Sequence, residues 1–196
     1  MKKTKIEYLL KFLLFLVLTS TINSNPAQAQ SSGNQAAFVK GSKTIGFSLG
    51  FGVNYNYYGG YASTPTFAFT YDQGFFENVG PGTIGIGGIV AVKNAYYNYP
   101  GGMKASWSDF IIGARGTYHL TLLKDMNNQF DPYGGIMFGF RVETFKDNYY
   151  QQSSTTVNPA AGIFVGAKYN FTEHFGAFAE LGFDISNARI GINVNF

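Results

Sequence analysis

The chain has 196 residues, with 14 Lys and Arg against 11 Asp and Glu, and no cysteine. Only 13% of the residues are charged, whereas 25 are Gly, 20 Phe and 14 Tyr, a composition unlike that of a soluble domain. The lack of cysteine excludes disulfides and a lipid-bearing cysteine. Two histidines without cysteine predict no metal site, and no motif predicts a cofactor.

Residues 1–29 have the pattern of a secretory signal peptide, with a basic start, an apolar stretch and the small-x-small site Ala27-Gln28-Ala29. The alternative is an uncleaved helical anchor. Lys11 interrupts the apolar run, which is short against the roughly 20 residues of a spanning helix. Residues 1–29 hold four of the 14 basic and one of the 11 acidic residues, so their removal leaves ten of each. The sequence therefore predicts no nucleic-acid partner.

Residues 30–42 are predicted to form a flexible polar lead, and residues 43–196 a single β domain. Within that domain, eight segments alternate apolar and polar residues with a period of two, which is typical of strands with one apolar face. The segments are 44–55, 66–71, 83–92, 109–119, 135–144, 161–171, 177–185 and 188–196. Ile185 is assigned to the apolar face of the seventh.

No segment after residue 29 is long and apolar enough for a membrane helix. A membrane protein without such helices must pair every backbone polar group in a closed barrel. The fold class is therefore predicted as all-β, a closed antiparallel eight-stranded transmembrane barrel with an up-and-down meander. The prolines are predicted to lie in connections or just ahead of strands, Pro132 and Pro159 among them.

Outer loops are predicted to be long and rich in Tyr, and inner turns shorter. The predicted outer loops are 56–65, 94–106, 146–159 and 186–188, and the inner turns are 73–82, 120–132 and 172–174. For residues 120–131, a short helix and an extension of the strands both remain open. Aromatic residues near the two ends predict two interfacial girdles, with Trp107 in the outer and Tyr133 in the inner one.

Periodicity alone allows two orientations of the apolar face. In a soluble secreted barrel, Phe47 and Phe138 would point inward and the surface would be covered with glycine, which contributes neither solubility nor strand stability. In a membrane barrel the bulky residues face lipid and the glycines fill the narrow lumen. Because the second arrangement explains both faces, we expect outer-membrane lipid to surround the chain.

The alternating strands, the segments "FDPYGGIMFGF" and "AFAELGFDIS" and the end "RIGINVNF" resemble the porin-like outer membrane protein β-barrel family, the small eight-stranded barrels of Gram-negative bacteria. The resemblance implies a location in the outer membrane. It also implies that a terminal aromatic preceded by alternating apolar residues is the tag read by the barrel-assembly machinery. Here that tag would be Ile190, Ile192, Val194 and Phe196.

Charged residues on the polar face are predicted to lie in the lumen. They are Asp72, Lys93, Asp109, Arg115, Arg141, Glu143, Lys168, Glu180, Asp184 and Arg189, of which we single out Arg115, Arg141, Glu143, Lys168 and Glu180. A pair such as Glu143 and Glu180 could serve acid/base catalysis. Charges of both signs in a narrow barrel are more simply explained by mutual neutralisation, which would plug the lumen.

The sequence predicts no enzyme and no catalytic residue. The outer-membrane lipid-modifying barrels resemble the chain in size but need a histidine near the outer rim, whereas His119 and His174 are predicted at the inner side. The predicted role is structural or adhesive, with the Tyr-rich loops as a possible surface for an extracellular ligand. The alternative for the loops is that they only cap the barrel and bind nothing. The alternative for the whole protein is a small passive pore.

Overall fold

The computed structural model describes residues 37–52, 62–121 and 128–196. The predicted signal peptide and the middle of the predicted 120–132 turn lie outside these residues. The described part contains nine strands, which are β1 (Lys43–Phe51), β2 (Ala62–Ser63), β3 (Thr66–Val79), β4 (Gly82–Asn98), β5 (Lys104–Leu120), β6 (Phe130–Asp147), β7 (Gln152–Asn170), β8 (Phe175–Gly182) and β9 (Ala188–Asn195).

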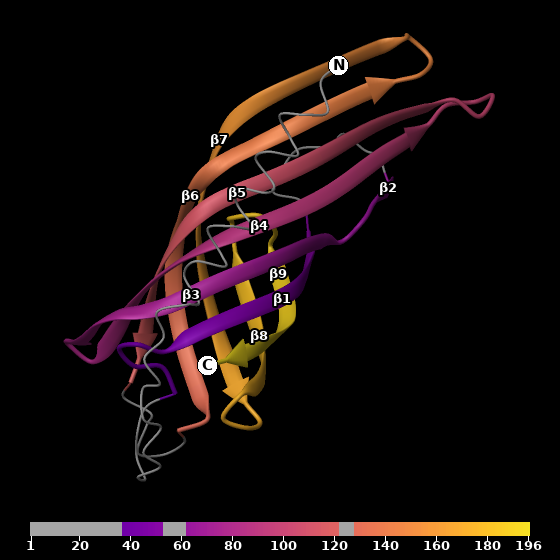
Figure 1. Ribbon diagram of the computed structural model, residues 1–196. Coiled ribbons are helices and arrows are strands. Elements are labelled where there is room, and N and C mark those ends of the chain that lie inside the picture. The colour runs from indigo at the N-terminus through magenta and orange to yellow at the C-terminus, as the bar shows by residue number, and fades with distance from the viewer. Residues whose placement is uncertain (1–36, 53–61, 122–127) are drawn as a thin grey trace. The chain divides into compact units, whose positions relative to one another are not determined.

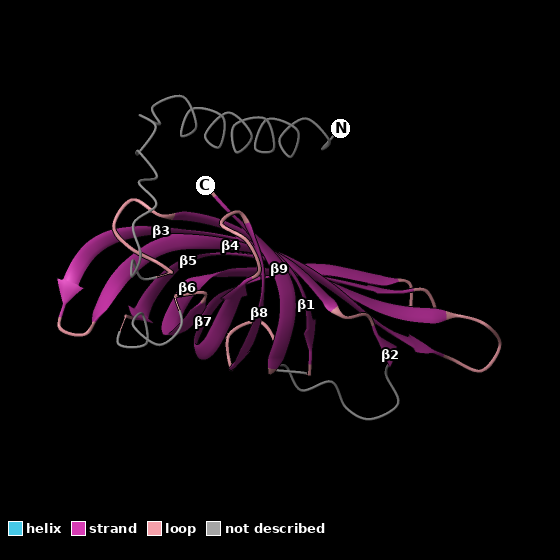
Figure 2. Ribbon diagram, turned by 90° about the horizontal axis from the view of Figure 1, so that it is seen from below, coloured by secondary structure: helices cyan, strands magenta, loops and turns pink. Residues whose placement is uncertain are grey.

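Eight of these strands form a closed antiparallel ring. Each pairs with its neighbour in the order β1, β3, β4, β5, β6, β7, β8, β9, and β9 pairs with β1 to complete the circle. The two-residue β2 pairs only with β4, beside the outer end of β3. The predicted fold class is therefore confirmed. Figures 1 and 2 show the strands curving around the ring, with the hairpins β4–β5 and β6–β7 extending well beyond β1, β8 and β9.

The register fixes the geometry of the ring. From Pro159 on β7, the paired residues run through Phe140, Phe47 and Ile192 and return to β7 at Tyr169, ten residues further along the same strand. For eight strands this stagger corresponds to a tilt of about 40° from the barrel axis. A barrel of this size leaves a bore that side chains can fill.

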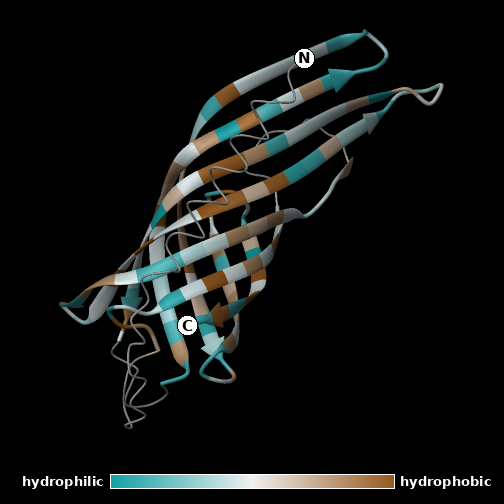
Figure 3. Cartoon of the chain, viewed as in Figure 1, coloured by the Kyte–Doolittle hydropathy of each residue, from teal (hydrophilic) through white to brown (hydrophobic). Residues whose placement is uncertain are grey.

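The apolar residues point away from the bore. Phe47 is 58% exposed, Phe138 62% and Ile163 62%, although all three lie in the middle of strands. The strands alternate hydrophobic and hydrophilic residues along their length, as Figure 3 shows. This orientation excludes the soluble barrel, in which these side chains would be buried, and gives the outer wall the apolar band that acyl chains require.

The strands extend further than the sequence predicts. The predicted loop 94–106 is reduced to the residues between Asn98 and Lys104, and the predicted loop 146–159 to those between Asp147 and Gln152. Residues 152–156 are all polar, so periodicity gives no strand signal there. The prediction for Pro159 was wrong, because it lies within β7. It is tolerated there because β8 pairs with β7 only from Phe164 onward, which leaves this stretch of β7 an edge.

Four further assignments were wrong. Tyr133 and Trp107 belong to the inward set of their strands, where Tyr133 is 5% exposed and Trp107 packs on Phe145 across the β5–β6 pair. Neither is a girdle residue. Ile185 follows the end of β8 and is buried with Met137 and Ile111 rather than facing outward. Pro132 lies in β6, just beyond the end of the β5–β6 pairing at Tyr133.

Arginine in the middle of the outer wall should destabilise the folded barrel. For Ile163→Arg we expect the free energy of unfolding, measured by denaturant titration in lipid vesicles, to fall by about 2–4 kcal/mol because a charge enters the hydrocarbon. Thr155→Arg, on the same face of β7 but beyond the apolar residues, should cost about 0–1 kcal/mol. Equal losses at both positions would contradict the assigned lipid-facing band.

Candidate functional site

The centre of the bore holds a chain of four ionised side chains. Arg115 on β5 donates through Nη2 to Glu180 Oε1 on β8 over 2.6 Å. Arg189 on β9 donates to the other oxygen of Glu180 and, over 2.7 Å, to Asp184 Oδ2. All four residues are at most 6% exposed. Two cations and two anions are thus matched within a few ångströms, as burial of charge requires.

Two aromatic side chains complete this central group. The hydroxyl of Tyr133 donates to Glu180 Oε1 over 2.7 Å, and the Arg115 guanidinium lies 4.1 Å from the centre of the Phe164 ring. Phe164 is 3% exposed and lies four positions from Lys168 on β7, so that both side chains face the bore. A guanidinium over a ring face gains cation–π attraction while its edge remains free for the carboxylate.

A second group lies at the inner end of the bore, around His119. Its Nδ1 is 2.8 Å from Asp131 Oδ2 and its Nε2 is 3.2 Å from Asp72 Oδ2, so both ring nitrogens face a carboxylate. Lys168 Nζ lies 3.9 Å from Asp131 Oδ2. Thr117 bridges the group by donating to Asp72 over 3.0 Å. An imidazolium would donate to both carboxylates at once.

The segment just before β1 occupies the same inner end. Phe38 is 2% exposed, stacks on His119 with ring centres 3.7 Å apart and lies 4.9 Å from Lys168 Nζ. Gly41 N donates to Gly74 O, and Gly74 N donates to Ser42 O, both over 2.9 Å. A Cβ on Gly74 would meet the carbonyl of Val39, so only glycine allows this close approach. Residues 37–42 therefore differ from the expectation of a flexible lead, because an aromatic side chain and a short ladder fix them to the barrel.

The outer half of the bore holds a third, looser group. Arg141 Nη2 lies 3.6 Å from Glu143 Oε2, and its Nη1 lies 4.0 Å from Asp109 Oδ2. Lys93 donates to the carbonyl of Gly52 over 3.4 Å. The side chain of Glu143 is 27% exposed, so this group is more hydrated than the two below it.

Little space remains between the central and inner groups. The void there has a volume of about 10 Å³, room for about one water molecule. It is lined by residues of both groups, including Arg115, Lys168, Asp72 and Glu180.

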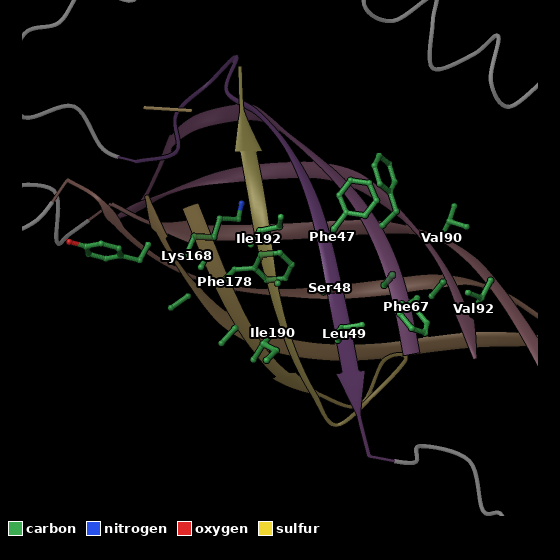
Figure 4. Close-up of a pocket in the computed structure, with 18 of the residues that line it drawn as sticks. Phe47, Ser48, Leu49, Phe67, Val90, Val92, Lys168, Phe178, Ile190 and Ile192 are labelled. Atoms are coloured by element: carbon green, nitrogen blue, oxygen red, sulfur yellow. The ribbon is translucent and has the colours of Figure 1, made fainter. Parts of the chain in front are cut away.

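A far larger hollow, of about 960 Å³, lies on the barrel wall. Figure 4 shows it crossing β9, β1 and β3, with Ile190, Ile192, Phe47, Leu49 and Phe67 around it. These side chains are 38–63% exposed and belong to the apolar band. The hollow therefore belongs to the apolar outer wall, whereas the charged groups described above lie in the bore.

The tips of the two long hairpins are joined by tyrosines. Tyr99, in the β4–β5 turn, packs against Tyr149, in the β6–β7 turn, with ring centres 5.2 Å apart. Its hydroxyl donates to Asp147 Oδ2 over 2.8 Å. Tyr149 and Tyr150 donate their backbone N–H groups to Asp147 Oδ1. Tyr149 is 53% exposed and Tyr150 62%, so the joined tips present aromatic surface to the outside.

These contacts change the acidity of Asp147. Burial acts to raise its pKa, but the N–H groups of Tyr150 and Tyr149 and the hydroxyl of Tyr99 outweigh that effect and lower the pKa below the ordinary value. A lowered pKa means that the contact is complete above the ordinary value of an aspartate and weakens only as the pH falls through the lowered one.

The five singled-out charges all lie on inward positions, but in different groups. Arg115 and Glu180 are in the central group, Lys168 in the inner one, and Arg141 and Glu143 in the outer one. The imagined catalytic pair Glu143 and Glu180 is thus divided between two groups. Sequence analysis did not find Phe38, Asp131, Tyr133 or Phe164. Asp131, Tyr133 and Phe164 are separated from the charged residues of their own strands by an even number of positions. They therefore share the inward face with those charges, and this spacing could have identified them from the sequence.

The proposed assembly tag lies on the outer wall of β9. Ile190 is 57% exposed, Ile192 63% and Phe196 55%, while Val194 is half-buried. His119 lies at the inner end of β5 and His174 in the turn between β7 and β8. In the described part of the chain, no helix has the length and hydropathy needed to cross a bilayer. Nor do the described His, Asp and Glu side chains form a group of three or more that could hold a metal ion.

Two solved structures share this architecture. The outer membrane protein OprG from Pseudomonas aeruginosa is similar with a TM-score of 0.51 and 16% identity, over 83% of this chain and 99% of that one. Ail, the attachment invasion locus protein of Yersinia pestis, solved in complex with the heparin analogue sucrose octasulfate, is similar with a TM-score of 0.50 and 13% identity, over 81% of this chain and 100% of that one. No family model and no curated protein matches the sequence.

The closed ring, the exposed apolar wall and these similarities define the class. The chain has the fold of the small eight-stranded outer-membrane β-barrels of Gram-negative bacteria.

Removing one charge from the central group should be costly. We expect Glu180→Gln to lower the free energy of unfolding by about 3–5 kcal/mol, because Arg115 and Arg189 would remain buried without their shared carboxylate. Denaturant titration in lipid vesicles measures the loss. Glu173→Gln, in the exposed β7–β8 turn, is the matched control and should change stability by less than about 0.5 kcal/mol. A loss as small as the control's would show that the central group does not hold the barrel together.

Proposed function

We propose that the chain is a non-enzymatic outer-membrane protein with a structural or surface-adhesive role, whose lumen is plugged by paired charges. The observation that carries this proposal is the void of about 10 Å³ between the central and inner groups, which is too small for a solute larger than water. The division of Glu143 and Glu180 between separate groups supports the absence of catalysis.

The inner end of the bore supports the same proposal. Phe38 stacks on His119, so a solute would have to displace both this aromatic side chain and the contacts of His119 with Asp72 and Asp131. Buried polar groups that lose their partners without replacement are costly. The proposed resting state is therefore closed at two successive levels.

The proposed route to the membrane uses the two ends of the sequence. Residues 1–29 would direct export and be cleaved. The outward residues Ile190, Ile192, Val194 and Phe196 would then be read by the barrel-assembly machinery before β9 pairs with β1. Their exposure on the wall of the closing strand fits recognition in extended form.

The proposed adhesive surface is the pair of hairpin tips. Tyrosine contributes large, rigid contact area with a polar end, as in adaptable binding surfaces. Tyr149 and Tyr150 are exposed and held together by Asp147 and Tyr99. The similar barrel Ail was solved in complex with the heparin analogue sucrose octasulfate, which supports the proposal that these tips bind a ligand.

Planar-bilayer recordings separate the plugged barrel from a small passive pore. We expect the refolded mature chain to insert without steady open steps. Replacing Phe38, His119, Arg115 and Glu180 together by Ala removes side chains from both closed levels of the bore and should produce steps. Folding of both proteins is checked by their resistance to denaturation in detergent. Steady steps from the unaltered barrel would favour the pore and contradict the plug.

Cell binding tests the adhesive role. Bacteria that display the barrel should bind immobilised extracellular-matrix protein, and Tyr149→Ser combined with Tyr150→Ser should reduce binding several-fold because the exposed aromatic surface is lost. Tyr169→Ser, at the opposite end of the barrel, is the matched control. Equal binding by all three strains would contradict the adhesive role, and only the structural role would remain.

A further inference from the structure

The outward face of the four long strands changes character along one row of paired residues. On β4, β5, β6 and β7, the last apolar outward residue is followed, two positions further out, by a polar one. The apolar members, paired in sequence across the sheet, are Val92, Phe110, Val142 and Val157. The polar members, paired in the same way, are Asn94, Ser108, Thr144 and Thr155. Because the strands are tilted by about 40°, this row is lower by about 3 Å on each strand from β7 to β4. We therefore take the outer edge of the hydrocarbon at the height of its middle members, Ser108 and Thr144.

Two lysines lie just beyond that edge on adjacent strands. Lys146 of β6 is opposite Ser106 of β5, and Asn148 N donates to Lys104 O over 3.0 Å. Lys104 and Lys146 are therefore diagonal neighbours on the same face, a relation that places Cα atoms about 7–8 Å apart. Both side chains are exposed.

The same face carries no opposing charge. Beyond the edge, the described outward residues of β4 to β7 include no Asp or Glu. The carboxylates of these stretches, Asp109, Glu143 and Asp147, have inward parity and bind other groups. At the inner end of the barrel, in contrast, both signs occur, with Lys43 on β1 and the exposed Glu77 on the neighbouring β3. The cation-only surface is thus a property of the outer edge.

The local structure also holds one ammonium group in place. Lys104 Nζ lies 5.6 Å from the centre of the Tyr96 ring, which is 38% exposed on β4. An aromatic face attracts the cation without neutralising its charge. The hydroxyls of Ser106 and Ser153 flank Lys146 in the same register row.

The height of the pair matches a lipid headgroup. With a tilt of about 40°, each strand residue rises about 2.5 Å along the barrel axis. Lys146 then lies about 5 Å above Thr144, and Lys104 about 10 Å above Ser108. Because the tilt puts Ser108 about 3 Å lower than its partner Thr144, the two lysines lie at nearly the same height, about 5–10 Å above the hydrocarbon edge. The headgroup layer is about 5–8 Å thick on each side, and a lysine stem can bend down into it.

The structure assigns Lys104 and Lys146 as a binding site for a phosphate group of a glycolipid in the outer leaflet. Two ammonium groups on one side of a phosphate neutralise its charge, and the neighbouring hydroxyls can donate to its sugar. The hydrocarbon edge directly below would hold the acyl chains of the same molecule. This site depends on the orientation of the barrel in the membrane, and on neither the plugged lumen nor adhesion by the tips.

Native mass spectrometry of the folded mature barrel in neutral detergent tests the site. The probe is purified bis-phosphorylated lipid A, with its dephosphorylated form for comparison. We expect bound lipid A on the unaltered barrel and about fivefold weaker binding for each Lys→Ser change at Lys104 or Lys146. Lys146→Arg should retain binding. Lys43→Ser, which removes the same charge at the inner end, is the matched control and should bind as the unaltered barrel does.

Three results would overturn the assignment. The first is equal binding of lipid A by the unaltered barrel and the folded double Lys→Ser variant. The second is equal binding of the dephosphorylated lipid, which would assign recognition to the acyl chains alone. The third is displacement of lipid A by millimolar inorganic phosphate, which would make the lysines a site for the free anion. Resistance to detergent denaturation confirms that each variant is folded.

Discussion

Complete pairing of the backbone inside hydrocarbon is the constraint on which the other features depend. An unpaired N–H or C=O group costs several kcal/mol there, so β9 must pair with β1. Closing eight strands with a stagger of ten residues fixes the tilt and a narrow bore. The alternation along each strand then separates two environments, so that Phe47 meets lipid while Ser48 faces the bore.

A narrow bore determines which side chains it can contain. Glycines at inward positions leave space for a few large groups: a Cβ on Gly191 would lie 2.7 Å from the Phe178 ring, and one on Gly46 would lie 3.0 Å from it. The charges that enter this space have no bulk water to solvate them, so each must meet an opposite charge or a hydrogen-bond donor. Glu180, with Arg115, Arg189 and Tyr133 around it, shows how one carboxylate can satisfy several neighbours.

Period-two alternation made the fold predictable, because eight segments carry it and each needs two partners. It also placed the lumen charges on the correct face, since Arg115 and Glu180 alternate with apolar residues. Strand length was not predictable, because residues 152–156 are all polar and carry no alternation. The position of Phe38 was not predictable for a different reason. It packs on the group of His119, Asp72 and Asp131, and these residues come together only when three different strands pair.

The strands β4 to β7 extend further outward than their neighbours in the ring, and this creates strand edges on β4 and β7. Among the described residues, the outer part of β7 has no second neighbour above β8, and the outer part of β4 has none above β3 except β2 and Thr64. Such edges are templates for pairing with other chains. Pro159 removes a donor from the β7 edge, while Ala62 and Ser63 cover the β4 edge at Tyr96 and Ala95. Pro159 and β2 therefore reduce, at two places, the open edge that the four-stranded extension offers to other chains.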